Sequence, residues 1–257
     1  MKMKFYVGIL LSIALLTSAC GSAATATSSP PSATQSTAST SAPSATQSST
    51  GLGLNPAPWK NGSTTSYEWQ NDQSGAQIGT SQISFALNNN EWTISEQDKI
   101  GELDQTIEMM VNAATLAPLG EKKTIKSSGT NADITTSYTN GKLDISADVS
   151  GKTSNASIDV PANAIDNDQL LMTLQALPFA QGYKASYVVI VAQNALKVNT
   201  TVTVLSQEKI AVPAGSFDTW HVEIQAGQFT QNAWYQVDAP HALVKYDNGT
   251  NRMVLSK

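Results

Sequence analysis

The chain has 257 residues, of which 40% are hydrophobic, and its 15 basic and 20 acidic residues give a formal net charge of −5. An acidic balance with no cluster of lysine and arginine argues against nucleic acid and against an anionic membrane surface as partners. The length suffices for a domain with a sizeable hydrophobic core. Because the chain has a single cysteine, it cannot form an internal disulfide.

Residues 1–20 have the pattern of the export signal of a bacterial lipoprotein. Lys2 and Lys4 precede the apolar run 5–16, which is too short for a permanent membrane span, and small residues come directly before Cys20. This arrangement resembles the bacterial lipobox, in which the cysteine receives diacylglycerol and becomes the new N-terminus after cleavage. We therefore predict a signal peptide over 1–20 and a lipid anchor on Cys20.

This leader departs from the usual lipobox at Thr17, where leucine is common. An ordinary secretory signal that happens to contain a cysteine is the alternative interpretation. Lipidation of the only cysteine leaves no thiol for a zinc site or for nucleophilic catalysis. Removal of the leader takes away two lysines, so that 13 basic residues face 20 acidic ones and the net charge becomes about −7.

Residues 21–58 consist almost entirely of Ser, Thr, Ala, Pro, Gln and Gly and carry no charge. Such a segment cannot bury enough apolar surface to offset its ordering entropy, so it is predicted to be a disordered tether. Flexible-chain statistics give a mean span on the order of 35 Å. The remaining residues, 59–257, are predicted to form one domain.

The domain shows the period-two alternation of β-strands at hairpin spacing. The clearest hairpin pairs an alternating run ending at Tyr138 with one beginning at Leu143. Between them, Asn140 and Gly141 supply the two positive-φ residues of a type I′ turn. Residues 102–116 are compatible with a strand or a helix, and a strand is favoured. Further strands are predicted at 83–87, 92–94, 187–191, 198–204, 220–224, 233–237 and 242–246.

One segment has helical rather than strand spacing. Asp166 and Gln169 have the form of a capping box, and Pro178 ends the segment. An isolated amphipathic helix must bury its apolar face, and the concave side of a curved sheet is the natural place. We therefore predict a mainly β fold, a curved antiparallel half-barrel with one amphipathic helix on its concave face. The leucines of the helix, which would line an apolar ligand cavity, are Leu170, Leu171, Leu174 and Leu177.

The segment 212–217 predicts a tight turn. Pro213 presets φ at the second turn position and Gly215 accepts a positive φ, so that Ala214 and Gly215 are expected to reverse the chain. Phe217 is out of phase with the strand that follows it. A β-bulge near Gly215 would explain this phase change.

Several of these motifs together resemble a bacterial family of domains of unknown function with a lipoprotein-carrier-like (LolA/LolB-like) half-barrel. The resemblance spans about 66–255 and is most specific after residue 160. It implies a strongly curved antiparallel sheet with a helix in its mouth and implies no known activity. The residues that carry it are the V-P-A-G-S-F run 212–217, Trp220, Val222-Glu223, Trp234-Tyr235, the segment 240–246 and the helix with its return, 166–183.

The sequence offers little catalytic or metal-binding chemistry. Asp166 and Asp168 suggest calcium, but the glycine and glutamate of a calcium loop are absent, so helix capping is the better interpretation. Ser216, Asp218 and His221 are a weak triad candidate, since neighbours on one strand point apart and no G-x-S-x-G elbow is present. We predict no metal, no cofactor and no enzymatic activity. The tryptophans are expected mainly in the core.

The sequence therefore predicts the cellular location of the protein in more detail than its activity. We expect a monomer tethered through Cys20 to the outside of the cytoplasmic membrane, with the outer membrane as the alternative in a two-membrane cell. The first hypothesis is a non-enzymatic lipoprotein that binds a lipid-like ligand. The second is a structural or interaction module of the envelope. An enzyme acting on wall polymer comes third, and clustered acids with perturbed pKa values in a cleft would favour it.

Overall fold

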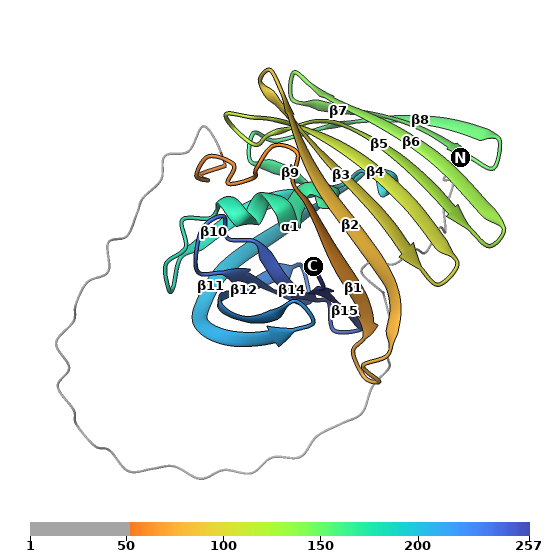
Figure 1. Cartoon of the computed structure of the whole chain (residues 1–257). Coiled ribbons are helices and arrows are strands. Elements are labelled where there is room, and N and C mark those ends of the chain that lie inside the picture. The colour runs from red at the N-terminus through yellow and green to blue at the C-terminus, as the bar shows by residue number, and fades with distance from the viewer. Residues whose placement is uncertain (1–51) are drawn as a thin grey trace, which may run out of the picture. The chain divides into compact units, whose positions relative to one another are not determined.

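The computed structural model describes residues 52–257, so the predicted signal peptide and Cys20 lie outside the described residues. The described residues form one 15-stranded sheet in the order β8-β7-β6-β5-β4-β3-β2-β1-β15-β14-β13-β12-β11-β10-β9 (Figure 1). The mainly β, curved and open sheet that the sequence predicted is therefore confirmed. No helix among residues 52–257 combines the length and apolar character that crossing a membrane requires.

The strands of the first half follow one another in the sheet in chain order. They are β1 (Thr64–Asn71), β2 (Gln77–Asn88), β3 (Glu91–Ile100), β4 (Leu103–Asn112), β5 (Pro118–Ser127), β6 (Thr130–Thr139), β7 (Lys142–Val149) and β8 (Lys152–Asp159). The ambiguous segment 102–116 is mostly β4, as favoured. Each strand pairs antiparallel with the next, because the connecting loops are short.

The second half contains the helical segment and the strands that return to β1. Its elements are β9 (Ala164–Asp166), η1 (Asn167–Gln169), α1 (Leu170–Thr173), η2 (Leu174–Ala176), β10 (Lys184–Val191), η3 (Ala192–Asn194), β11 (Leu196–Val212), β12 (Gly215–Ala226), β13 (Phe229–Gln236), β14 (Leu243–Asp247) and β15 (Asn251–Leu255). β15 pairs antiparallel with β1, which unites the two halves in one sheet. The parallel pair is β9 with β10, at the end of the sheet.

The β6–β7 hairpin has the predicted register. Asn140 and Gly141 have φ values of 52° and 73°, and Tyr138 lies opposite Leu143. Both loop residues therefore adopt the left-handed conformation that a type I′ turn requires.

The β11–β12 turn differs from the prediction in detail. Val212 lies opposite Gly215, so the two loop residues are Pro213 and Ala214, while Gly215 is already the first residue of β12, with a φ of 136°. The expected bulge near Gly215 is absent from this pairing. The register shift lies instead at Leu205 of β11, where a strand of 17 residues bends within the curved sheet.

The helical segment, η1, α1 and η2 together, lies on the concave side of the sheet (Figure 1). Leu174 and Leu177 are 0% exposed, Leu170 is buried, and Leu171 is only partly buried. Only α1, with four residues, is α-helical, and 3₁₀ turns flank it. Asp166 caps the segment by accepting from the N–H of Asp168, but the predicted capping box does not form, because the Gln169 side chain donates to the Leu116 carbonyl instead.

The domain begins earlier than predicted. The tether was expected to run to residue 58, yet residues 52–59, the leading segment, pack on the domain, and Leu52 is 6% exposed. The Asn55 N–H donates to the carbonyl of Ala176 at 2.8 Å, and the Trp59 indole stacks on Phe85 with ring centroids 5.1 Å apart. Burial of the apolar side chains of this short segment offsets the entropy cost of ordering it.

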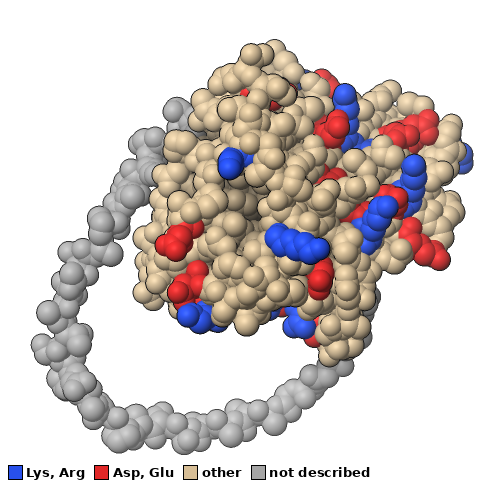
Figure 2. Space-filling view, viewed as in Figure 1, with Lys and Arg blue, Asp and Glu red and all other residues tan. Residues whose placement is uncertain are grey.

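Charges of both signs are interspersed on the surface shown in Figure 2. The strand register explains part of this mixture, because oppositely charged residues lie opposite each other on neighbouring strands. Examples are Lys99 with Asp104 and Glu108 with Lys122. Such cross-strand pairs each stabilise a sheet modestly and prevent a large field of one sign.

The docking of the leading segment predicts a stability effect at Trp59. Replacing Trp59, which is 7% exposed, with alanine removes the stacking on Phe85 and the hydrogen bond to the Met172 carbonyl. We expect W59A to lower the free energy of unfolding by about 3–5 kcal/mol in urea titrations. The exposed neighbour Lys60 supplies the control, since K60A should change it by less than about 0.5 kcal/mol. Equal stability of W59A and K60A would contradict the docked arrangement.

Candidate functional site

The residues predicted as sites fall into two separate places. The helix leucines are on the concave face, whereas Pro213 and Gly215 are at the β11–β12 turn, whose Ala214 N–H donates to the carbonyl of Leu255 at 3.2 Å. The turn therefore shapes a hairpin and does not contribute to the helix environment.

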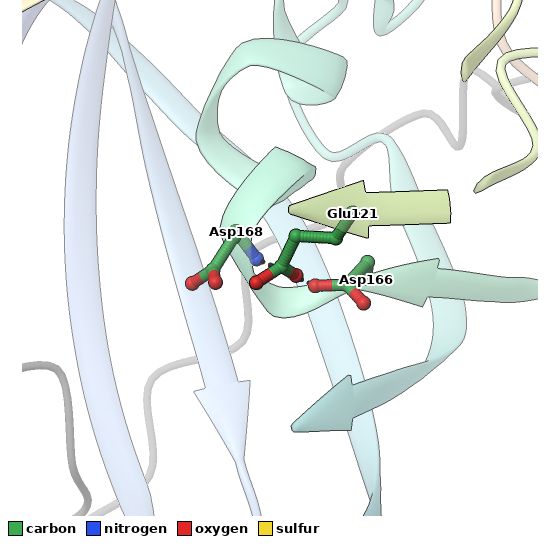
Figure 3. Close-up of side chains that lie close together, drawn as sticks. All are labelled: Glu121, Asp166 and Asp168. Carbon is green, nitrogen blue, oxygen red and sulfur yellow. Dashed lines mark hydrogen bonds between the residues drawn. The ribbon is translucent and has the colours of Figure 1, made fainter. Parts of the chain in front are cut away.

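The strongest concentration of buried ionisable groups is an acidic cluster, Glu121, Asp166 and Asp168. One carboxylate oxygen of each lies within 4.8 Å of the others. Figure 3 shows the three side chains converging where the end of β9 and the start of the helical segment meet β5. Residues far apart in the sequence therefore share one small volume under the sheet.

Strand alternation and a helix cap together place these groups. Glu121 and Lys123 are two apart on β5, so both leave the sheet on its buried side, while Lys122 between them is exposed. Asp166 is the N-cap of η1, and its backbone is extended, with φ −71° and ψ 144°. This capping geometry turns the chain so that Asp168 follows immediately over β5.

Most oxygens of the two aspartates already accept hydrogen bonds. The amino group of Lys123 lies 2.6 Å from Oδ2 of Asp168, and the side-chain amide of Asn167 donates to Oδ1 of the same residue at 3.2 Å. Asp166 accepts from the Tyr138 hydroxyl and from the N–H of Asp168, the latter at 2.9 Å. The aspartates are therefore held in place by fixed donors.

Glu121 is different, because its Oε2 is buried without a hydrogen-bond partner. The hydroxyl of Thr136 is also buried without a partner, and Thr136 lies directly opposite Glu121 in the β5–β6 pairing. Glu121 is 1% exposed and Thr136 is 4% exposed. A buried polar atom without a partner is costly, so two of them on adjacent strands need an explanation.

Burial and mutual repulsion shift the pKa values of the cluster. Burial, and then the charges of Asp168 and Asp166, raise the pKa of the Glu121 carboxyl well above its usual range. Burial and the charge of Asp168 raise the pKa of Asp166 to about 7. Burial acts in the same direction on Asp168, but the Lys123 ammonium outweighs it and lowers the pKa of that carboxyl. For Lys123, the neighbouring acids outweigh burial and raise the pKa of the amine.

A second buried acid lies on β3. Asp98 accepts from the hydroxyl of Ser81 and, at 3.0 Å, from the side-chain amide of Gln105. Burial and the charge of Asp98 raise the pKa of the nearby Glu96 well above its usual range. Carboxyl groups thus recur on the buried side of β3 and β5, an environment suited to cations and to hydrogen-bond donors.

Beyond the polar groups, the inner side of β7 is apolar and incompletely covered, whereas the same side of β8 carries Ala156 and Ile158 but also Lys152 and Ser154. Ala147, Val149 and Ile158 are partly buried, and they belong to the same side as the fully covered Leu143. The opposite side of β7 carries Lys142, Asp144, Ser146 and Asp148. This inner apolar margin, Ala147, Val149 and Ile158, leaves part of the concave face accessible.

The weak triad candidate does not assemble. The ring nitrogens of His221 contact Glu208 at 3.2 Å and Asn232 at 2.8 Å, and Asp218 pairs with Lys209 at 3.5 Å. His221 instead stacks on Trp234, with ring centroids 4.6 Å apart. These residues form cross-strand contacts that stabilise the sheet.

Two of the three acids of the cluster were identified from sequence patterns. Asp166 and Asp168 were predicted to be capping residues, which is correct for Asp166, whereas Glu121, Lys123 and Tyr138 were not predicted to take part. A signal was present at Glu121 and Lys123, which alternate in phase with the buried Ile125. Ionisable residues at inward positions of a strand are rare unless they are paired.

Comparisons with known proteins bear on the family and the fold. A family model described as "Protein of unknown function (DUF3108)" matches residues 64–256. A solved β-barrel-like protein of the domain of unknown function DUF1849, from Brucella abortus, has a TM-score of 0.54 and 14% identity over 76% of this chain and 95% of that chain. A protein of YmcC-like fold from Bacteroides fragilis aligns over 79% of this chain and 98% of that chain, with a TM-score of 0.29 and 8% identity. No curated protein matches this chain.

These comparisons confirm two expectations: a family of domains of unknown function and a curved, barrel-like sheet. The finer likeness to LolA/LolB-like carriers, and the V-P-A-G run as a family signature, stay predictions.

The contact between Lys123 and Asp168 predicts a large stability effect. In K123M the carboxylate of Asp168 keeps its burial but loses its cation, so we expect the free energy of unfolding to fall by about 3–5 kcal/mol. K122M is the matched control, because Lys122 is the exposed neighbour on the same strand. Chemical denaturation of both variants tests this, and a K123M protein as stable as K122M would refute the role assigned to the pair.

Proposed function

The chain belongs to the DUF3108 family of proteins of unknown function. We propose, from its own residues, that it is a non-enzymatic, membrane-anchored lipoprotein of the bacterial envelope that binds a lipid-like ligand. The observation that carries this proposal is the inner apolar margin, Ala147, Val149 and Ile158, at the uncovered part of the concave face. A partly exposed apolar surface on the inside of a curved sheet suits an acyl chain.

The openness of the sheet supports the same function. β8 and β9 are the two ends of the strand order, and no hydrogen-bonded ladder between them closes the described sheet into a barrel. The helical segment covers the middle of the concave face, where β9 and η1 pack near β5 and β4. A ligand entering at β7 and β8 would therefore meet the helical segment as the inner wall of its site.

The helical segment depends on its contacts with the rest of the domain. Its single α-helical stretch has four residues, too few for stability without tertiary contacts. Three hydrogen bonds hold its backbone: the Tyr235 hydroxyl to the Leu171 carbonyl at 2.9 Å, the Trp59 indole to Met172 at 3.3 Å, and the Asn55 N–H to Ala176 at 2.8 Å. Its buried side chains and the ion pair of Asp168 with Lys123 hold it as well, so a ligand would meet it as a packed wall of the site.

The proposed membrane location is supported by the sequence of the leader, residues 1–20. Lipidation of Cys20, with two acyl chains, satisfies the requirement for stable anchoring, and the predicted tether places the domain away from the headgroups. The protein then acts as a monomer with the membrane as its first partner. The acidic balance of the chain does not favour nucleic acid.

One observation favours a structural or protein-interaction module as the second candidate. Leu174 and Leu177 are fully buried, so the centre of the concave face is filled by the protein's own side chains. An enzyme acting on wall polymer has less support, because Glu121 and Asp166 are buried under the helical segment and offer no open cleft to a polymer. A lipid-binding assay separates the first two candidates.

The anchor is tested directly at the cysteine. C20S should lose incorporation of radiolabelled palmitate and appear in the soluble exported fraction, whereas the unchanged protein should sediment with membranes and extract into detergent. S18A, which keeps a small residue before the cut site, is the control and should behave as the unchanged protein. Membrane retention of C20S together with its palmitate label would rule out this anchor.

The ligand is tested with the untethered domain, residues 52–257. A fluorescent fatty acid should bind stoichiometrically, and V149D or I158D should weaken it at least about tenfold, because a charge in an acyl site costs more than 1.4 kcal/mol. S146D, on the outer side of β7, is the matched control and should bind normally. Failure of the unchanged domain to bind fatty acid or phospholipid would favour the interaction module.

A further inference from the structure

We propose that the acidic cluster, Glu121, Asp166 and Asp168, with the hydroxyl of Thr136, is a binding site for one divalent cation of the calcium type. The proposal is independent of the lipid-like ligand. It assigns a binding role to Glu121 and Thr136, which neither helix capping nor the Lys123 pair accounts for.

The first argument is charge. The cluster brings three carboxylates and the Lys123 ammonium into a buried volume, where the formal charge with all groups ionised is −2. Transfer of uncompensated charge into a protein interior is expensive. Protonation of Glu121, whose pKa burial raises, removes part of this charge, and a single divalent cation would bring the fully ionised group to a formal charge of zero.

The second argument is the pair of atoms without partners. Oε2 of Glu121 and the hydroxyl of Thr136 are both buried, and the β5–β6 register places their side chains on the same side of adjacent strands. Residues directly opposite in an antiparallel pair have their Cβ atoms about 5 Å apart, so both oxygens can reach one ion. Both atoms are oxygen acceptors, which is what a hard cation requires.

The third argument concerns which cation fits. All the groups offer oxygen, and the cluster contains no histidine or cysteine, so zinc and copper are disfavoured. Calcium takes six to eight oxygen ligands in a flexible geometry, whereas magnesium demands a near-ideal octahedron and dehydrates reluctantly, so a buried site of protein oxygens favours calcium.

The position of the site gives the cation a structural consequence. Glu121 and Thr136 belong to β5 and β6, whereas Asp166 and Asp168 belong to β9 and η1. The ion therefore ties the start of the helical segment to the concave face, beside the contact between Lys123 and Asp168. Calcium binding should strengthen the closure of the helical segment on the sheet.

The experiment is a calcium titration of the full chain, extracted from membranes in mild detergent and freed of metal with EDTA. At a calcium concentration about 100-fold above the dissociation constant, the melting temperature should rise by about 5–10 °C. Magnesium at the same concentration should give a smaller shift. Isothermal calorimetry should report one site per chain.

Two variants and one control identify the ligands. E121Q should weaken calcium binding at least about tenfold, while its melting temperature in EDTA stays equal to or above that of the unchanged protein, because a buried carboxyl without a partner is removed. T136V, which is nearly the same shape, should weaken binding without abolishing it. E108Q changes an exposed glutamate of β4 and should bind calcium as the unchanged protein does.

Each possible result of these titrations either supports or overturns the calcium site. A calcium shift that is lost in E121Q, reduced in T136V and kept in E108Q supports the site, and T136V carries the test if E121Q does not fold. No calcium shift in the unchanged protein, or an equal shift in E121Q and E108Q, overturns it.

Discussion

The pairing of β1 with β15 is the interaction on which the rest of the architecture depends. It runs from Tyr67 opposite Leu255 to Asn71 opposite Asn251, between strands at the two ends of the domain sequence. Without it, β2 to β8 and β9 to β14 would be two separate meanders. Such a long-range contact carries a high entropy cost of chain closure, which local hairpins do not share. Its formation lets the curved sheet bring its second half over the inner side of its first half.

The acidic cluster is the clearest product of that long-range arrangement. Glu121 and Lys123 come from the first meander, and Asp166 and Asp168 from the return that begins the second. Buried ionic groups of this kind are weak contributors to net stability, because desolvation offsets their attraction. They do specify where the two parts meet, since any displaced register would leave several charges buried without partners. The apolar helix face alone would tolerate a shift along the concave surface more easily.

The sequence predicted what local chemistry determines. The Asn140–Gly141 hairpin has the expected register because two positive-φ positions leave little choice of turn. The helical segment was found because its leucine spacing conflicts with strand alternation. The bulge at Leu205 was misplaced, because a phase change in sequence does not show which of two paired strands carries the extra residue. The role of Glu121 could not be predicted either, because its neighbours Asp166 and Thr136 are set by strand order and register, which local patterns do not encode.

The leading segment gives the domain a mechanical property. Any force applied to the described chain from its N-terminal side acts first on residues 52–59. Asn55 and Trp59 of this segment donate hydrogen bonds to the backbone of the helical segment. Peeling this segment away would remove two of the three hydrogen bonds that hold that backbone and would leave the Tyr235 hydroxyl on Leu171. Tension on the chain and loosening of the cover over the concave face are therefore coupled. Force applied from the N-terminal side would therefore act first on the contacts that hold this cover in place.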